Sequence, residues 1–256
     1  MENPTKGAEV RHRWVDHIPL IWAEPPGPSN PARLVIWLGG LGGRKEELSS
    51  HLKRMASMGF HAAAYDLWQH GERGTEDRDQ IMRRVFGNFY LHMWPILARS
   101  TEDALRVIDW AETEFGPLGK VCMGGISMGG DISVAALPLD RRIECAAAAI
   151  ATADWRRPGM DIPPGEPDSY ARLMYERLNP MTHTASYVHC PAITFECGET
   201  DAHVPPEGAL RFRDALRDTY AACGERLRVT LHRGTGHRFT RDMLENCLEW
   251  FVRHTR

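Results

Sequence analysis

The chain has 256 residues, a length that fits one large domain with a sizeable core. Its composition is ordinary for a globular protein, with 43% hydrophobic and 25% charged residues and a formal net charge of −3 at pH 7. This balance argues against a nucleic-acid partner or a membrane surface, and no apolar run approaches transmembrane length. The arginine pairs Arg83-Arg84, Arg141-Arg142 and Arg156-Arg157 are isolated, and we interpret them as solvated surface.

Six cysteines are spread along the chain, and none has the C-x-x-C spacing of a zinc site. Cys122, Cys145 and Cys197 lie in apolar runs, which predicts buried free thiols in a reducing compartment. Residues 1–7 lack the apolar core of a signal peptide. The sequence therefore predicts a cytoplasmic protein.

The first half of the chain predicts an antiparallel pair followed by alternating strands and helices. Residues 10–24 alternate loosely between apolar and polar side chains, as two paired strands do. The stretch 67–99 is polar, then aromatic, and predicts no regular element. Apolar runs and helical periodicity predict strands at 34–38 and 60–66 and helices at 45–58 and 101–114.

The second half continues the alternation, with one interruption. Residues 154–188 contain five prolines and little strand pattern, which predicts a cap insertion over the carboxyl edge of the sheet, with one short helix. Thr240 is the predicted N-cap of a last helix. We therefore expect a single α/β domain over 1–256 with a mostly parallel sheet flanked by helices. The further predicted elements are strands at 143–151, 191–197 and 227–232 and a helix at 206–220.

One short stretch carries the strongest chemical signal. Residues 125–129 read Gly-Ile-Ser-Met-Gly, a G-x-S-x-G motif between a predicted strand and a helical pattern. There a strained turn lifts the hydroxyl of Ser127 out of the sheet, and the helix N-terminus points backbone N–H groups at developing negative charge. The alternative is an ordinary strand-to-helix loop, so the interpretation depends on partners elsewhere in the chain.

A serine nucleophile needs a neighbouring base, and position selects it among twelve histidines. His237 follows Gly234-Thr235-Gly236, in the loop between the last predicted strand and the last helix. That loop lies at the same sheet edge as Ser127. The alternatives are that His237 is a surface histidine, or that His203 is the base.

The acid that orients the base is expected at a strand end between the serine and the histidine. Asp201 follows a predicted strand directly, and Glu199 is its local rival, whereas Glu196 fits better within the strand. The order Ser…Asp…His is the one expected for a G-x-S-x-G motif on an α/β scaffold.

The oxyanion hole needs two backbone donors. Met128, the residue after the nucleophile, supplies one N–H. The second is expected from the loop 39–43, Gly-Gly-Leu-Gly-Gly, with Leu41 as the donor. This loop lacks both the Lys-Ser/Thr of a phosphate loop and the G-x-G-x-x-G pattern, so a nucleotide site is the weaker interpretation.

Together these motifs resemble the α/β-hydrolase superfamily, from about Leu34 to the C-terminus. The chain is most similar to small bacterial serine esterases of the dienelactone-hydrolase and prolyl-oligopeptidase-like group. Two departures are that Gly39-Gly40 replaces the His-Gly of many relatives, and that Ser127 replaces the cysteine nucleophile of true dienelactone hydrolases. The resemblance rests on the G-x-S-x-G at 125–129, the Gly-x-x-Asp at 198–201 with Val204-Pro205, Gly236-His237, Asp66-x-x-x-His70-Gly71-x-Arg73 and Trp94-Pro95-Ile96-Leu97.

Other polar residues have simpler explanations than catalysis. Asp66, His70 and Arg73 are expected to tie down the turn after their strand rather than to contact substrate. His92 and Trp94 either line the pocket or belong to the core, and the core is favoured. For Asp131, in the first helical turn after the serine, the helix dipole is a sufficient account.

The sequence thus predicts a cofactor-free and metal-free serine esterase acting on a small-molecule ester through an acyl-enzyme. Ser127 is the nucleophile, His237 the base and Asp201 the orienting acid. A thioesterase or small-peptide hydrolase with the same triad is the alternative enzyme, and a small-molecule receptor on the same fold is the alternative of another class. The substrate, its acyl chain and the oligomeric state are not predicted.

Overall fold

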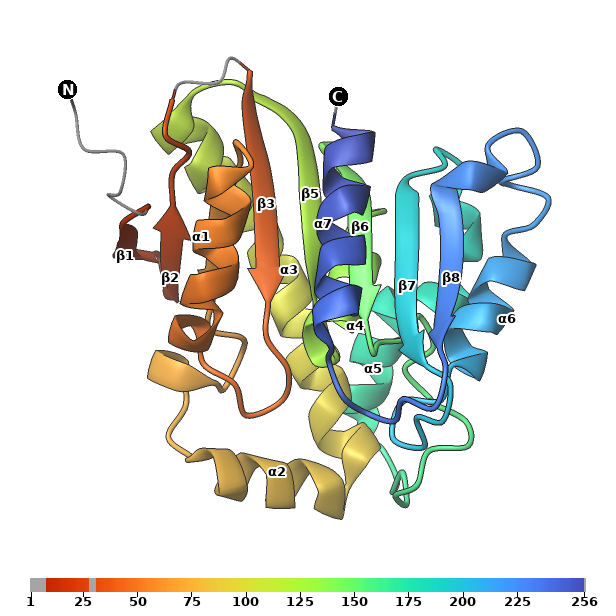
Figure 1. The fold of residues 1–256 in the computed structure, drawn as a ribbon. Helices are drawn as coiled ribbons and strands as arrows, with labels where there is room; N and C mark the ends of the chain where they lie inside the picture. The colour runs from red at the N-terminus through yellow and green to blue at the C-terminus, as the bar shows by residue number, and fades with distance from the viewer. Residues whose placement is uncertain (1–7, 28–30, 256) are drawn as a thin grey trace.

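The computed structural model describes residues 8–27 and 31–255. Residues 1–7, on which the prediction about a signal peptide rests, lie outside these ranges. An eight-stranded sheet with the order β1-β2-β4-β3-β5-β6-β7-β8 forms the centre of the molecule (Figure 1). The strands are β1 (Val10–Val15), β2 (Ile18–Ala23), β3 (Ala32–Leu38), β4 (His61–Tyr65), β5 (Leu118–Ile126), β6 (Ile143–Ala149), β7 (Ala192–Gly198) and β8 (Leu227–His232).

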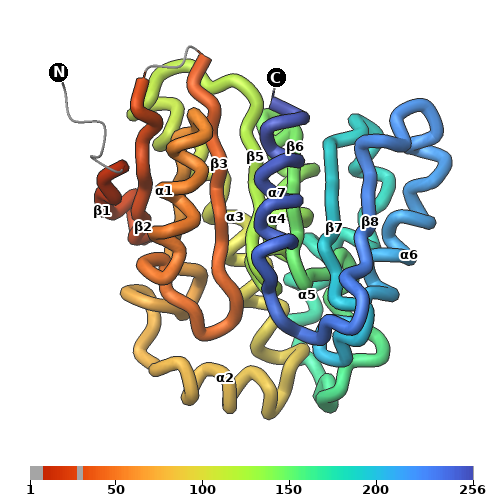
Figure 2. Tube along the Cα trace, in the orientation of Figure 1, coloured from red at the N-terminus to blue at the C-terminus, as the bar shows by residue number. Residues whose placement is uncertain are grey.

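Strands β3 to β8 run parallel, and the β1–β2 hairpin joins the sheet antiparallel through β2 and β4. This confirms the predicted antiparallel opening and the mostly parallel sheet. Because β3 to β8 all point the same way, the loops that follow them meet at one sheet edge. Figure 2 shows the loop between β8 and α7 running along that edge, at the bottom of the view.

Helices cover both faces of the sheet. They are α1 (Ser49–Ser57), α2 (Arg78–Gly87), α3 (Phe89–Phe115), α4 (Met128–Ala136), α5 (Ser169–Leu178), α6 (Glu207–Ala215) and α7 (Arg241–His254). Short 3-10 turns lie at Lys45–Leu48, Gly71–Arg73, Pro180–Thr182, Thr184–Tyr187 and Gly224–Arg226. One apolar cluster joins the sheet to α1 and α7, and a second joins its other face to the remaining helices. The core therefore has two layers, one on each side of the sheet.

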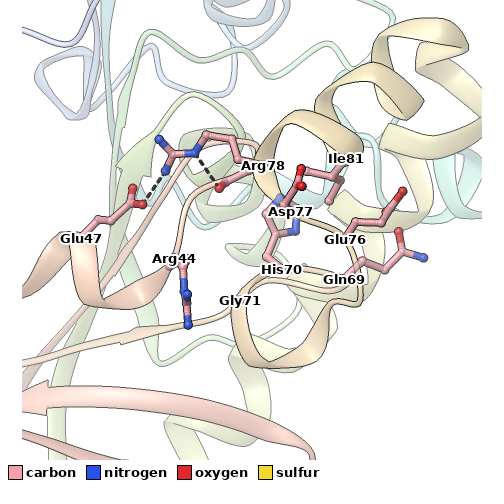
Figure 3. A pocket seen from close by; sticks show the side chains of 10 residues that line it. Arg44, Glu47, Gln69, His70, Gly71, Glu76, Asp77, Arg78 and Ile81 are labelled. Atoms are coloured by element: carbon pink, nitrogen blue, oxygen red, sulfur yellow. Dashed lines mark hydrogen bonds and ion pairs between the residues drawn. The ribbon is translucent and has the colours of Figure 1, made fainter.

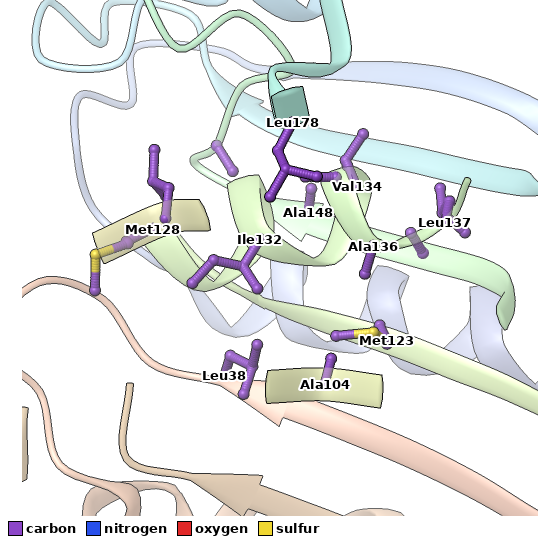
Figure 4. Packing of buried hydrophobic residues seen from close by; sticks show 14 of the residues in the cluster. Leu38, Ala104, Met123, Met128, Ile132, Val134, Ala136, Leu137, Ala148 and Leu178 are labelled. Atoms are coloured by element: carbon purple, nitrogen blue, oxygen red, sulfur yellow. The ribbon is translucent and has the colours of Figure 1, made fainter. Parts of the chain in front are cut away.

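Helix α4 lies in the larger of these layers (Figure 4). Ile132 and Val134 are fully buried, as are Leu38 and Met123 from the neighbouring strands. Leu178, at the end of α5, packs in the same cluster. The helix that follows Ser127 is thus enclosed by apolar side chains, which hold its first turn in a fixed place.

The stretch 67–99 is where the structure differs most from expectation. Helix α3 begins at Phe89, twelve residues before the predicted start at Thr101, and contains Pro95. Asn88 caps it by accepting a hydrogen bond from the Leu91 amide at 3.3 Å. Proline removes one helical hydrogen bond, which is why the pattern predicted no helix there. Buried side chains on this segment, Trp94 among them, supply the compensating tertiary packing.

Within the described ranges, no helix combines the length and apolarity that crossing a membrane requires. Cys122, Cys145 and Cys197 are buried, as predicted, and all six cysteines are free thiols. The predicted cap of Thr240 on α7 is confirmed, since its side chain accepts from the Met243 amide at 3.2 Å.

Candidate active site

Ser127 lies between the end of β5 and the start of α4, in a backbone conformation that few residues adopt. Its φ is 53° and its ψ is −118°, a strained combination for a residue with a side chain. The Ser127 amide donates to the Ala149 carbonyl at 2.8 Å, and the Ser127 carbonyl accepts from Gly130 at 2.8 Å. The strained turn is therefore held from both sides, at the N-terminus of a buried helix.

The glycines beside Ser127 are required by space. A Cβ on Gly125 would lie 2.5 Å from the Leu38 carbonyl oxygen, and one on Gly129 would lie 2.4 Å from the same atom. Both distances are shorter than any normal contact, so the close approach of β3 to the turn excludes larger residues.

We expect Gly129→Ala to destabilise the fold by about 1–3 kcal/mol or more, because the Leu38 carbonyl is backbone and cannot turn aside. Urea denaturation followed by circular dichroism measures the change. Gly87→Ala is the matched control, since its Cβ would meet nothing within 4 Å. An unchanged urea midpoint for Gly129→Ala would show that the turn relaxes freely.

His237 and Asp201 come together at the same sheet edge. The Nδ1 atom of His237 lies 2.8 Å from Oδ2 of Asp201. The other carboxylate oxygen, Oδ1, accepts from the amides of His203 at 2.9 Å and Val204 at 2.8 Å. The two loops also meet through their backbones, where the Thr200 amide donates to the Thr235 carbonyl at 3.0 Å.

The charge state of Asp201 determines which nitrogen of His237 carries the proton. Burial alone would raise the pKa of Asp201, but hydrogen bonds from His237 and the Val204 amide outweigh it and hold the pKa below its usual range. An ionised carboxylate only accepts, so Nδ1 of His237 is the donor. In the neutral imidazole the lone pair is then on Nε2, the nitrogen that a general base uses.

The rival residues are occupied elsewhere. The Glu199 carboxylate accepts from the Gly234 amide at 2.9 Å and supports the loop rather than the His237 ring. Nδ1 of His203 lies 3.2 Å from Asp161, while its ring packs edge-on against His237 with centroids 4.9 Å apart. Glu196 is fully buried within β7, as predicted.

The loop 39–43, here called the glycine loop, lies against the turn that carries Ser127. A Cβ on Gly40 would lie 3.7 Å from Cβ of Ser127, an ordinary van der Waals distance, so Gly40 is a direct neighbour of the nucleophile. The loop is a tight turn in which the Gly43 amide donates to the Gly40 carbonyl at 3.0 Å. Leu41 and Met128 thus lie on the two segments that adjoin Ser127, and their role as oxyanion donors stays a prediction.

Asp66 anchors the segment that follows the glycine loop. Its carboxylate accepts from the Lys45 amide and ammonium, each at 2.9 Å, and from the Glu72 amide at 2.9 Å. Lys45 is 1% exposed and also pairs with Glu46 and Glu72. Burial alone would lower the pKa of Lys45, but these partners raise it above its usual value. The sequence pattern did not indicate that Lys45 is buried, because it stands among charged residues at the start of a predicted helix.

Arg73 and His70 in that turn, and Trp94 in α3, behave as expected. Arg73 donates to the Asp66 carbonyl at 3.1 Å and pairs with Asp103 at 2.6 Å. Nδ1 of His70 donates to the Trp68 carbonyl at 2.9 Å. Trp94 is a core residue, 4% exposed, and its indole N–H donates to the Trp155 carbonyl at 2.9 Å. Hydrogen bonds, the ion pair with Asp103 and packing therefore account for these side chains.

A cavity of about 310 Å³ lies between the glycine loop and α2 (Figure 3). Arg78 spans it, donating to the Gly42 carbonyl at 3.0 Å and to Glu47 at 2.5 Å. Helix α2, which lies beyond the carboxyl ends of the strands in Figure 1, is thereby tied to the glycine loop. The polar lining of this cavity is largely paired within the protein, and neither Ser127 nor His237 belongs to it.

Two predictions about charged residues need correction. Arg157, interpreted from the sequence as solvated surface, is 3% exposed and pairs with Asp131 at 2.5 Å. Asp131 is fully buried, so the helix dipole is only part of its environment. The sequence gave no signal for this pair, because its members are 26 residues apart and each has a simpler local explanation.

In the part of the chain that the structure describes, no three histidine, cysteine or acidic side chains gather as a metal site requires. The arrangement at the sheet edge consists of a hydroxyl, an imidazole, a carboxylate and backbone amides. These are the groups of nucleophilic acyl transfer.

Comparison with known proteins gives the same fold and class. A family model described as the prolyl oligopeptidase family matches residues 47–256. The chain is 23% identical over 231 residues to the "Putative esterase YitV" of Bacillus subtilis, a match that covers 85% of this chain and 88% of that protein.

Solved structures are also similar. TT1662 from Thermus thermophilus has a TM-score of 0.78 at 24% identity, over 96% of this chain and 97% of that chain. The acylaminoacyl peptidase of Pyrococcus horikoshii has a TM-score of 0.70 at 17% identity, over 98% of this chain but 42% of that one. At these identities the likeness establishes the fold, which is the α/β-hydrolase fold.

Proposed function

The chain belongs to the prolyl oligopeptidase family, and from this premise we propose that it is a serine esterase. Membership in this family and in the α/β-hydrolase superfamily makes it a serine hydrolase. The proposal adds the substrate, a small-molecule carboxylic ester, and the residues. Ser127 is the nucleophile, His237 the general base and Asp201 the orienting acid.

The observation that carries the proposal is the hydrogen bond between His237 and Asp201 at the edge where Ser127 follows β5. Asp201 is held in place by two backbone amides, so it fixes both the tautomer and the orientation of the imidazole. The strained turn at Ser127 presents its hydroxyl at the same edge. Among the residues that the structure describes, no other histidine near this edge has a carboxylate partner that accepts hydrogen bonds from backbone amides.

The reaction proceeds in two halves. Nε2 of His237 removes the Ser127 proton as Oγ attacks the ester carbonyl, and the amides of Leu41 and Met128 hold the resulting oxyanion. The imidazolium then protonates the leaving alcohol, and an acyl-enzyme remains. Water, activated by the same imidazole, releases the acid and regenerates Ser127.

The match to YitV over most of its length favours an ester over a peptide as the substrate. YitV, described as an esterase, matches this chain over 88% of its length, whereas the acylaminoacyl peptidase is matched over 42% of its own. The family match itself favours the second candidate, a small-peptide hydrolase with the same three residues.

We further propose that residues 154–188 cover the site, together with α2. The Asp161 amide donates to the Ala202 carbonyl at 2.8 Å, beside the turn that holds Asp201. Asn88, between α2 and α3, donates to the Glu166 carbonyl at 3.1 Å. These contacts join the segment 154–188 to the turn that holds Asp201 and to the junction between α2 and α3, on one side of the site.

Parallel assays test the substrate. We expect hydrolysis of p-nitrophenyl esters, with acyl length reporting the size of the pocket, and slower turnover of matched thioesters and peptide p-nitroanilides. Faster turnover of the anilides would replace the ester proposal with the peptide one. A fluorophosphonate probe tests for an activated serine, and an unlabelled protein would point to a receptor on this fold.

Ester hydrolysis is expected to fall as the pH is lowered, because a protonated imidazole cannot accept the Ser127 proton. The measurement is kcat/KM from pH 5 to 8 with a substrate that does not titrate in this range. Circular dichroism at each pH controls for unfolding. A flat profile over this range would rule out His237 as the base.

A further inference from the structure

The side chain of His203 touches three separate parts of the proposed active site. Its ring packs edge-on against the His237 ring, with centroids 4.9 Å apart and planes at 67°. The ring of Phe86, in α2, also packs edge-on against it, with centroids 5.2 Å apart. Its Nδ1 atom lies 3.2 Å from Oδ1 of Asp161, in the segment 154–188. The reaction proposed above gives this side chain no task.

His203 is itself held in place by bonds that do not involve the His237 ring. Its amide donates to Oδ1 of Asp201 at 2.9 Å, so its backbone is tied to the carboxylate that also bonds His237. Because a carboxylate only accepts, Nδ1 of His203 donates to Asp161. The Asp161 amide in turn donates to the Ala202 carbonyl at 2.8 Å. The His203 ring is therefore a fixed surface beside the base.

The His237 ring needs such a surface. Its side chain is 28% exposed and lies in the loop between β8 and α7. The hydrogen bond from Nδ1 to Asp201 fixes one atom of the ring, but the ring can still rotate about that bond. In the part of the chain that the structure describes, His203 is the one aromatic ring that packs against His237. This second point of contact limits the rotation.

The His203 ring is also suited to lie beside a group that becomes charged. Burial lowers the pKa of His203, and the positive charge of Arg157 lowers it further. The ring is therefore uncharged near pH 7. It can stay in contact with His237 while that imidazole takes up the Ser127 proton, because no like-charge repulsion arises between the two rings.

We propose that His203 is a positioning residue for His237, and that it acts through its ring rather than through its hydrogen bond to Asp161. The ring limits rotation of the imidazole about the bond to Asp201, so that Nε2 keeps the direction that proton transfer from Ser127 requires. The inference rests on the proposed role of His237 as base. It adds the side chain that keeps this base oriented.

Two substitutions separate the ring of His203 from its hydrogen bond. His203→Phe keeps an aromatic ring beside His237 but has no donor for Asp161. His203→Asn keeps a donor near the position of Nδ1 but has no ring. Because an error of about 1 Å in the placement of a reacting group can cost about 10²-fold in rate, we expect kcat of the Phe variant to exceed that of the Asn variant by about tenfold or more. KM should be the same in both, since the contact is made to the base and not to the substrate.

Steady-state hydrolysis of a short p-nitrophenyl ester measures kcat and KM. End-point labelling with a fluorophosphonate counts the active sites, so that misfolded protein does not enter kcat. His254→Asn is the matched control, since the His254 ring packs against Trp250 with centroids 4.3 Å apart. It lies at the end of α7, opposite the loop between β8 and α7 in Figure 1. This variant loses a comparable aromatic contact, and its kcat should equal that of the wild type.

The ratio of kcat between the Phe and Asn variants decides the outcome, and a ratio below about ten overturns the proposal. Equal losses in the two variants would mean that His203 takes part in the chemistry itself. A greater loss in the Phe variant would mean that it acts through Asp161. A change confined to KM would mean that it contacts the substrate.

NMR of ring-labelled histidine gives a second readout that needs no substrate. The proton on Nδ1 of His237, assigned with His237→Gln, should keep a sharp signal in the Phe variant and broaden by exchange with water in the Asn variant. If the wild type hydrolyses no ester, the esterase proposal fails and this comparison alone decides the role of His203. Equal signals in the two variants would then overturn it, so the two proposals fail separately.

Discussion

Replacing Ser127 by alanine is expected to abolish ester hydrolysis, with kcat lowered by up to about 10⁶-fold. The substitution removes the one oxygen that the strained turn presents at the end of β5. Without it no acyl-enzyme forms, and only the backbone donors and substrate binding remain to assist attack by water. Steady-state hydrolysis of a short p-nitrophenyl ester measures the loss.

Ser57→Ala is the control for this variant. The Ser57 hydroxyl donates to the Arg54 carbonyl at 2.6 Å at the exposed end of α1, away from the carboxyl edge of the sheet. Its activity should equal that of the wild type. If Ser127→Ala retains a tenth or more of the activity, the nucleophile lies elsewhere and the esterase mechanism is wrong.

Replacing Asp201 by asparagine is expected to lower kcat by about 10⁴-fold with little change in KM. The amide keeps the size of the side chain, but its NH₂ group can donate to His237 Nδ1, which stabilises the wrong tautomer. The lone pair is then on Nδ1, away from Ser127. Because the backbone amides of His203 and Val204 still have an oxygen to bond, the turn should stay folded.

Glu199→Gln separates this effect from a general loss of negative charge. Glu199 lies two residues before Asp201 and accepts from the Gly234 amide, a bond that glutamine can still make. We expect its activity to stay within about twofold of the wild type, since surface substitutions of this kind have small effects. Equal losses in the two variants would mean that Asp201 has no special role.

The sheet and its order of elements were predictable because their signals are local. Apolar runs such as 34–38 and 143–151 indicate buried parallel strands. The cap of α7 is also local, because Thr240 makes it with its own side chain. The G-x-S-x-G turn was predictable for the same reason, since the close contacts of Gly125 and Gly129 demand glycine.

The parts that escaped prediction depend on contacts between distant segments. Pro95 in α3 is tolerated because buried neighbours compensate for a lost hydrogen bond, and a sequence window does not reveal that packing. Lys45 and Arg157 have the look of surface residues until the fold brings Asp66 and Asp131 beside them. The residues next to a lysine or arginine in sequence do not indicate whether a buried carboxylate will lie beside its side chain in the fold.

Helix α2 buries few of its side chains against the rest of the protein. Ile81 and Val85 are its buried side chains, and the Arg78 contact with Gly42 joins it to the glycine loop. The free energy needed to detach it is therefore a small part of the total for unfolding, whereas α4 is buried along its whole length. Amide hydrogens of α2 should exchange with deuterium long before those of α4. Helix α2, at the carboxyl edge of the sheet, would thus loosen while the turn at Ser127 stays folded.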